Sequence, residues 1–155
     1  MMSRADDLVY LETEGACANC GLKDARALTI HHLDPTPPKD ESYDNKIVLC
    51  HNCHQCHHQH KGPTAAQLNE TKRRLIIKTL TTPGLNALKQ AFRNPAVVAI
   101  PFLVNHLVEF GYLRQKDILS TVTDDDWGPD SEIVAEAVFV ITPRGRALLT
   151  KWKLN

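Results

Sequence analysis

Apolar and polar residues alternate along the first part of the chain in a way that predicts two strands between short helices. The strand candidates are residues 27–32 (ALTIHH) and 46–50 (KIVLC), which a proline-rich loop separates. Ser3 and Asp6 have the spacing of a helix N-terminus, so a short helix should come first. After the second pair of cysteines, a histidine-rich helix should stop at Gly62.

In the second part of the chain, apolar residues first recur at helical spacing, and two strands and a last helix come after these predicted helices. Thr64 and Gln67 have the spacing of a capping box, and the helix that they begin should run to about Leu80. Pro83 and Gly84 should break that helix. The pattern then predicts helices over 85–92 and 95–110, strands over 117–122 and 137–142, and a last helix from residue 142 onwards.

The longest apolar region, residues 96–113, should not cross a membrane. Asn105, His106 and Glu109 interrupt it, and each of them would be costly in a bilayer. The N-terminal residues have none of the marks of a secretion signal, so we expect a cytoplasmic protein whose thiols stay reduced.

The helix predicted over 95–110 should bury one apolar stripe. We expect this stripe at Ile100, Leu103, Leu107 and Phe110.

The residue types change abruptly at a Gly-Pro pair, residues 62 and 63. All five cysteines and seven of the eight histidines come before it. The later sequence contains no cysteine and a single histidine, His106. This break predicts two domains, residues 1–62 and residues 63–155, in an α+β protein.

Two Cys-x-x-Cys pairs, Cys17/Cys20 and Cys50/Cys53, have the spacing by which tight turns present thiolates to a tetrahedral zinc ion. Cys53/Cys56 is an alternative second pair. A domain of about 60 residues with few large apolar groups has little core, and a structural zinc contributes roughly 10 to 16 kcal/mol to its folding. We therefore expect one structural Zn²⁺.

Residues 17–61 resemble the HNH nucleases, which are also called the ββα-metal or His-Me finger group. A cysteine pair is followed by LTIHHLDP (residues 28–35), by Asn45 and by CHNCH (residues 50–54), in the order and near the spacing of that family. Asn45 lies five residues before the Cys50/Cys53 pair, which favours that pair for zinc. The resemblance implies a ββα fold and metal-dependent hydrolysis of phosphodiester bonds in DNA.

The same resemblance implies roles for individual side chains. His31 and His54 would hold the catalytic cation, which would be Mg²⁺, Mn²⁺ or Ni²⁺. His32 would be the general base that takes a proton from water, and Asn45 would hold the loop and orient this base. His58, four residues after His54 on one helical face, remains an open choice as a third ligand.

The second domain has the element order of a winged helix, with three helices, a two-stranded wing and a C-terminal helix. Residues 137–152 in particular resemble the end of the wing and the last helix of winged-helix regulators. The helix over 95–110 contains no Lys or Arg, so it should not dock on phosphates. We expect this domain to bind a second copy or a protein partner. Acidic residues fill the expected wing: Asp124, Asp125, Asp126, Asp130 and Glu132.

The formal net charge is zero, so a case for nucleic acid depends on local sites. The residues that we expect to contact DNA phosphates are Lys61, Lys72, Arg73, Arg74 and Lys78. The leading hypothesis is a zinc-containing HNH endonuclease that hydrolyses DNA. The rival is a zinc-binding winged-helix protein that binds DNA or acts as an adaptor, with a silent nuclease site.

Overall fold

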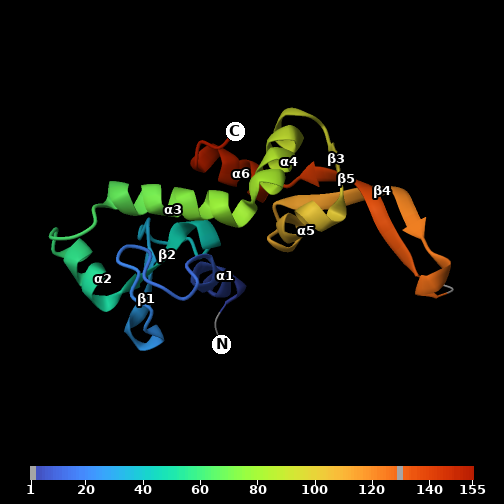
Figure 1. Cartoon of the computed structure of the whole chain (residues 1–155). Coiled ribbons are helices and arrows are strands. Elements are labelled where there is room, and N and C mark those ends of the chain that lie inside the picture. The colour runs from blue at the N-terminus through green and yellow to red at the C-terminus, as the bar shows by residue number, and fades with distance from the viewer. Residues whose placement is uncertain (1–2, 129–130) are drawn as a thin grey trace. The chain divides into compact units, whose positions relative to one another are not determined.

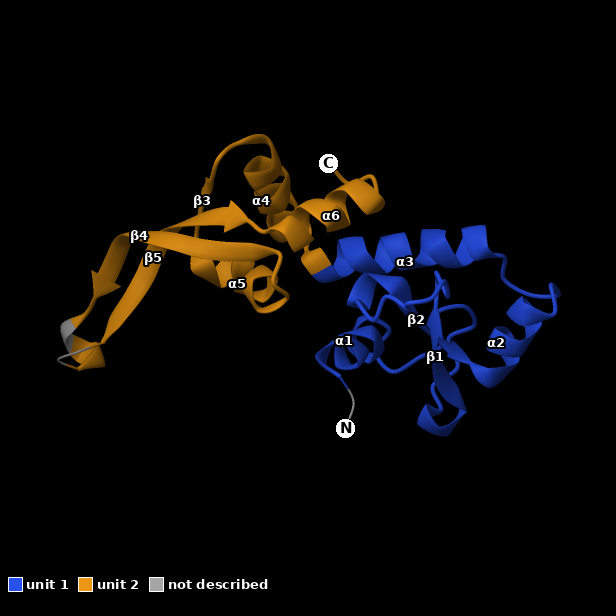
Figure 2. Cartoon of the chain, turned by 180° about the vertical axis from the view of Figure 1, so that it is seen from behind, with its two compact units in different colours: residues 1–79 blue, residues 80–155 orange. Residues whose placement is uncertain are grey.

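The computed structural model describes residues 3–128 and 131–155 and is a mixed α+β structure (Figure 1). Contacts divide the chain into two compact units, Met1–Thr79 and Leu80–Asn155 (Figure 2). Each unit contains its own antiparallel sheet. The α+β class that the sequence predicted is thereby confirmed.

Over its described residues, 3–79, the first unit consists of a hairpin, three α-helices and two short 3-10 turns. The sequence predicted this hairpin and these helices, but it placed the third helix in the second domain, residues 63–155, whereas that helix belongs to the first unit up to residue 79. The elements are α1 (Arg4–Glu12), η1 (Ala25–Ala27), β1 (Leu28–His32), η2 (Tyr43–Asn45), β2 (Lys46–Cys50), α2 (His51–His58) and α3 (Ala65–Leu80), whose last residue begins the second unit.

Strands β1 and β2 form the frame of the first unit. They pair antiparallel, with Leu28 opposite Cys50 and His32 opposite Lys46. Helix α2 follows β2 directly and packs against both strands, while α1 packs against β2. Because β2 is covered in this way, it is buried along its whole length. The cysteines and histidines of interest are therefore mounted on a well-packed hairpin and its following helix.

Reciprocal side-chain caps begin two helices, as the sequence predicted. At the start of α1, Ser3 Oγ accepts from the Asp6 N–H and Asp6 Oδ2 accepts from the Ser3 N–H, both at 3.1 Å. Thr64 and Gln67 make the same exchange at the start of α3, at 2.8 and 3.2 Å. These caps satisfy N–H groups that the helix itself leaves unpaired.

The histidine-rich helix α2 differs slightly from its expected extent. It begins at His51, inside the second cysteine pair and not after it. Cys50 is its N-cap, because the Cys50 Sγ accepts from the Cys53 N–H at 3.4 Å. It ends at His58, before the expected stop. Gly62 lies against the helix instead, since a Cβ at this position would come within 2.6 Å of the Cys56 Cβ.

A buried ion pair ties α3 to the rest of the first unit. Lys72 Nζ lies 2.6 Å from Glu12 Oε1, and both side chains are fully buried. The Tyr43 hydroxyl donates to the other Glu12 oxygen at 2.5 Å, and the Lys72 ammonium lies 3.7 Å from the centre of the Tyr43 ring. The contacts therefore assign α3 up to residue 79 to the first unit, although the residue types already change at residue 62.

Over residues 80–128 and 131–155, the second unit combines a three-stranded sheet with three α-helices. The strands are ordered β3-β5-β4, and the far end of the β4–β5 hairpin extends beyond the helices of its unit (Figure 1). The elements are α4 (Thr82–Arg93), β3 (Val97–Ala99), α5 (Pro101–Glu109), β4 (Leu113–Thr123), η3 (Asp125–Trp127), β5 (Glu132–Ile141) and α6 (Pro143–Lys151).

The helix expected over residues 95–110 begins later than predicted. Residues 97–99 form β3 and pair with β5, and α5 starts only at Pro101. The sequence offers a proline at a first helical position twice, at residues 95 and 101. The two valines of β3 favour a strand, and pairing with β5 supplies the hydrogen bonds that decide between the two starts.

The apolar stripe predicted for this helix is also corrected. Leu107 is buried, as expected, but Ile100 and Leu103 are 50% and 41% exposed. Pro101 and Val104 take their places in the core. The inward face of α5 runs through Pro101, Val104 and Leu107 at a spacing of three residues, so Leu103 lies beside this face and Ile100 precedes the helix.

The remaining expectations for the second unit concern the wing and the last helix. The two predicted strands are present and longer than expected, and Thr142 Oγ1 caps α6 by accepting from the Gly145 N–H at 3.0 Å. In the wing, Asp124 and Glu132 are exposed, while Asp130 lies outside the described residues. Over the described ranges, every helix is too short or too polar to cross a membrane.

Candidate metal centres

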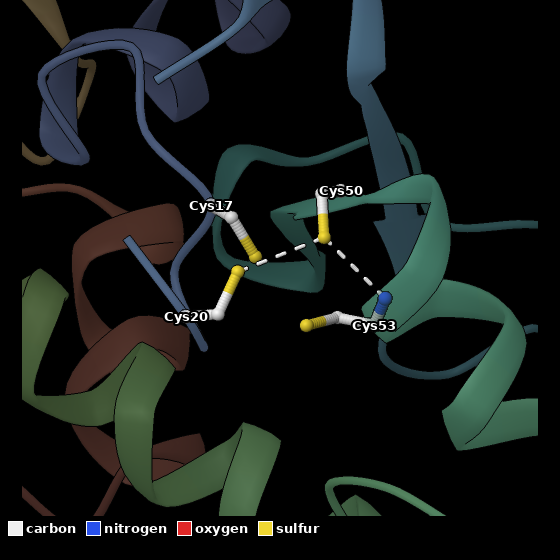
Figure 3. A group of neighbouring side chains, drawn as sticks. All are labelled: Cys17, Cys20, Cys50 and Cys53. Atoms are coloured by element: carbon white, nitrogen blue, oxygen red, sulfur yellow. Dashed lines mark hydrogen bonds between the residues drawn. The ribbon is translucent and has the colours of Figure 1, made fainter. Parts of the chain in front are cut away.

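Four cysteine side chains of the first unit gather around one point (Figure 3), and we call them the sulfur cluster. Cys20 Sγ and Cys50 Sγ lie 3.7 Å apart, close to the separation of about 3.8 Å that a tetrahedral zinc with Zn–S bonds of about 2.3 Å requires. The four sulfurs could therefore hold a zinc ion, as the sequence predicted. The members, whose Sγ atoms all lie within 4.8 Å of one another, are Cys17, Cys20, Cys50 and Cys53.

Local backbone geometry shapes each half of the sulfur cluster. After the first pair, Gly21 has a φ of 76°, which favours glycine, and its N–H donates to the Cys17 carbonyl at 2.9 Å. Between the two cysteines, the Ala18 N–H donates to the Val48 carbonyl at 2.9 Å and anchors the turn on β2. The second half needs no separate turn, because Cys50 ends β2 and caps α2.

The electrostatics of the sulfur cluster suit a cation. Burial raises the pKa of the Cys53 thiol to about 12, although Asn19 Nδ2 donates to its sulfur at 3.3 Å. Burial also opposes ionisation of Cys17, but hydrogen bonds from the backbone of Cys20, Cys50 and Asn19 outweigh it and lower the pKa to about 7. One sulfur thus ionises near neutral pH, and a bound zinc would supply the charge that stabilises the other thiolates.

Cys56 is not a member of the sulfur cluster. It is half-buried, its sulfur lies 3.9 Å from Asn52 Oδ1, and its Cβ backs Gly62. The alternative pair Cys53/Cys56 is therefore not formed.

Three histidines form a second group, which we call the histidine cluster. His31 comes from β1, and His54 and His58 lie one turn apart on α2. One ring nitrogen from each lies within 4.8 Å of the others, and the two Nε2 atoms on α2 are 3.2 Å apart. The structure thus brings together the residues that the sequence singled out, including the open choice His58.

An open pocket of about 430 Å³ borders the histidine cluster. His32 lines it beside the three cluster members, although its side chain leaves β1 in a different direction from that of His31. Two further residues of the lining were not expected: His57, whose ring centre lies 4.9 Å from that of His31, and Lys39. The pocket therefore joins a candidate metal site, a candidate base and a cationic side chain.

Two members of the histidine cluster, His31 and His54, favour the neutral form of their imidazoles. Burial, followed by repulsion from the neighbouring imidazoles, lowers the pKa of His31 to about 4. Burial and the neighbouring imidazoles also lower the pKa of His54. Because the neutral imidazole is the form that binds metal, these side chains are ready to act as ligands at neutral pH.

Asn45 holds the loop between the two strands. Its side-chain oxygen accepts from the Asp34 N–H at 2.9 Å, and its Nδ2 donates to the carbonyls of Asp34 and Asp40 at 3.0 and 2.9 Å. The side chain is only 1% exposed, so these bonds are shielded from water. Asn45 thus fixes both ends of this loop segment, at Asp34 and at Asp40.

His32 is held by a carboxylate from the same loop. His32 Nε2 lies 3.0 Å from Glu41 Oε1, and the other oxygen of Glu41 lies 2.6 Å from Lys46 Nζ. Lys46 is 3% exposed and also pairs with Asp6 at 2.8 Å. Sequence reasoning missed these contacts, because only the pairing of β1 with β2 brings His32 and Lys46 opposite each other.

The residues that were expected to contact DNA phosphates differ in exposure and in ion pairing. Lys61 is exposed and Arg73 is half-buried. Arg74 and Lys78 are exposed but lie in ion pairs, with Glu70 at 3.2 Å and with Glu14 at 2.9 Å respectively. Exposed pairs of this kind are weak, so both side chains remain able to exchange partners.

Lys72 must be removed from the phosphate-contacting set. Its side chain has no exposed surface and pairs with Glu12 inside the first unit. Along α3, Lys72 lies midway between Leu68 and Ile76, which are both buried. The helical spacing of four residues therefore puts this lysine on the inward face, a signal that the basic run from 72 to 74 obscures.

Comparison with protein-family models, with curated proteins and with solved structures gave no match to this chain. The case for both clusters therefore rests on their geometry and residue chemistry.

Proposed function

We propose that the first unit is a metal-dependent HNH endonuclease that hydrolyses phosphodiester bonds in DNA. The observation that carries the proposal is the histidine cluster beside His32 in one pocket. A structural zinc alone requires only the four sulfurs. Three convergent imidazoles with a fourth imidazole next to them, at an open pocket, are the parts that metal-assisted hydrolysis needs.

The positions of the side chains support the roles that the resemblance implied. His32 takes a proton from a water molecule as the water oxygen attacks phosphorus, and the bond from phosphorus to the leaving oxygen breaks. A divalent cation on the histidine cluster would bind the scissile phosphate and stabilise negative charge on the leaving oxygen. Asn45 keeps the loop that carries Glu41 in place, and Lys39 offers a positive charge to a neighbouring phosphate.

The ligand set favours one of the three cations considered from the sequence. Mg²⁺ and Mn²⁺ prefer oxygen ligands, whereas imidazole suits Ni²⁺. Since the cluster consists of three imidazoles and no carboxylate, we expect Ni²⁺ to support activity better than Mg²⁺.

The second unit serves, in this proposal, as a winged-helix-like module that binds a second copy or a protein partner. Its long hairpin carries large apolar side chains that are about half exposed, at 49%, 48% and 55% for Ile118, Val122 and Ile133. Exposed apolar groups close together favour protein contacts. The acidic residues of the expected wing disfavour contact with phosphates, so DNA binding is assigned to Lys61, Arg73, Arg74 and Lys78.

Cleavage of supercoiled plasmid tests the proposal. Wild-type protein with Ni²⁺, Mn²⁺ or Mg²⁺ is compared with His32→Ala, and circular dichroism checks that both are folded. Removing a general base should slow cleavage by roughly 10² to 10⁴-fold. If wild type and variant leave the DNA equally intact, the rival function, a zinc protein that binds DNA or acts as an adaptor with a silent site, takes precedence.

A further inference from the structure

The loop between β1 and β2 brings a carboxylate to the candidate base. Glu41 Oε1 lies 3.0 Å from His32 Nε2, while its second oxygen lies 2.6 Å from Lys46 Nζ. Lys46 and then His32 lower the pKa of Glu41 below its ordinary range, so the group is ionised at neutral pH. An ionised carboxylate only accepts hydrogen bonds.

The proton on neutral His32 is consequently assigned to Nε2. A bond between this nitrogen and Glu41 requires that the nitrogen carry hydrogen, because the carboxylate has none to give. Nδ1 then has the lone pair. The hydrogen bond made by one ring nitrogen thus decides which of the two nitrogens is free to take a proton from water.

The carboxylate is itself fixed from two directions. On one side, Lys46 is 3% exposed, lies opposite His32 in the hairpin, and is held by Asp6 of α1 at 2.8 Å. On the other side, the carbonyl of Asp40, directly before Glu41, accepts from Asn45 Nδ2 at 2.9 Å. A side chain that is 64% exposed is thus given a defined place by buried neighbours.

We propose that Glu41 is a positioning residue, which holds the imidazole of His32 through Nε2–H and leaves Nδ1 as the nitrogen that accepts the proton from water. This inference rests on the proposed nuclease function for its role in a reaction. The contact between Glu41 and His32, by contrast, is a property of the folded protein and can be tested without cleavage.

Nitrogen-detected NMR of histidine side chains tests the contact in the full-length, zinc-loaded protein. Spectra are recorded at about pH 8, where ordinary imidazoles are neutral, and His32→Ala identifies the signals. Wild type should show an Nε2 proton that exchanges slowly with water. Glu41→Ala should lose this protection. The control Glu14→Gln, which alters another exposed carboxylate paired with lysine, should keep it. An unprotected Nε2 in wild type would overturn the inference.

Cleavage kinetics then test the role. Glu41→Ala should lower kcat by roughly 10 to 100-fold with little change in KM, the size typical when a partner that orients an active side chain is lost. Glu41→Gln keeps an acceptor oxygen and should fall in between. An unchanged kcat overturns the role, and so does a raised kcat, which would mean that the carboxylate blocks the base. An inactive wild type would instead refute the proposed function, while the NMR result still decides the contact.

Discussion

The sulfur cluster and the histidine cluster share helix α2 but differ in their surroundings. Three of the four cysteines are buried, whereas only His31 of the three histidines is. The histidine cluster borders an open pocket of about 430 Å³. A closed set of four ligands leaves a metal no free position, while three ligands at a pocket leave room for water or substrate. The same helix thus supports one site suited to stability and one suited to chemistry.

The largest effect should come from removing a sulfur. Cys20→Ser changes the exposed member of the sulfur cluster, so the core itself is hardly disturbed. Zinc binding of roughly 10 to 16 kcal/mol is comparable with the whole stability of a domain, so the first unit should unfold. Zinc content by mass spectrometry and thermal unfolding by circular dichroism measure the result. Cys56→Ser, outside the cluster, should retain zinc and fold; a folded, zinc-loaded Cys20→Ser would contradict the assignment.

Removing a histidine of the histidine cluster should weaken metal binding but leave the first unit folded. His54→Ala should weaken Ni²⁺ binding by roughly 100-fold or more, since losing a direct ligand costs more than the 10 to 100-fold typical of its supporting contacts. Titration calorimetry on zinc-loaded protein measures the affinity. The matched control is His51→Ala, on the same helix but outside the cluster. If His54→Ala binds Ni²⁺ as wild type does, or unfolds as Cys20→Ser should, the two clusters do not divide their roles in this way.

A third test measures how much the buried ion pair of Lys72 and Glu12, which lies outside both clusters, contributes to the free energy of unfolding. Lys72→Met leaves Glu12 buried without its cation, which should cost about 3–5 kcal/mol of unfolding free energy. The double variant Lys72→Met with Glu12→Gln removes both charges and should recover part of this loss. Denaturant unfolding with zinc present measures both. A loss below about 1 kcal/mol in the single variant would show that the pair contributes little.

The smallest effect concerns the ion pair of Asp6 with Lys46, the lysine that also pairs with Glu41. A hydrogen bond from Lys46 holds the pKa of Asp6 below its ordinary value of 3.8. The stability from this pair is therefore complete above 3.8, declines below it, and is lost as the pH falls through the lower pKa that Asp6 has in the folded protein. Asp6→Asn should cost about 0.5–1 kcal/mol at neutral pH, because solvent still screens a partly buried group, and the cost should shrink as the pH falls below 3.8. Unfolding free energies across this range provide the check, and a difference independent of pH would contradict it.

Local spacing was informative wherever neighbours in sequence decide the outcome. Reciprocal caps at Ser3 and Thr64 mark helix starts, because the groups involved lie within three residues of each other. The start of α5 was mispredicted, since residues 97–99 become a strand only by pairing with β5, some 40 residues away. Lys72 was misjudged for a related reason, because its partner Glu12 comes from α1.

By itself, the sequence determined which side chains can hold metal. Cysteine spacing predicted the four members of the sulfur cluster, since ligand chemistry depends on residue type and on short turns. The resemblance of residues 17–61 to HNH nucleases implied His31 and His54 as further ligands and left His58 open. Only the tertiary structure decided that His58 joins the histidine cluster, that Cys56 stays outside the sulfur cluster, and that Glu41 holds His32. These outcomes depend on how the hairpin packs against α2 and on how its loop folds back, which are contacts between distant segments that local patterns do not encode.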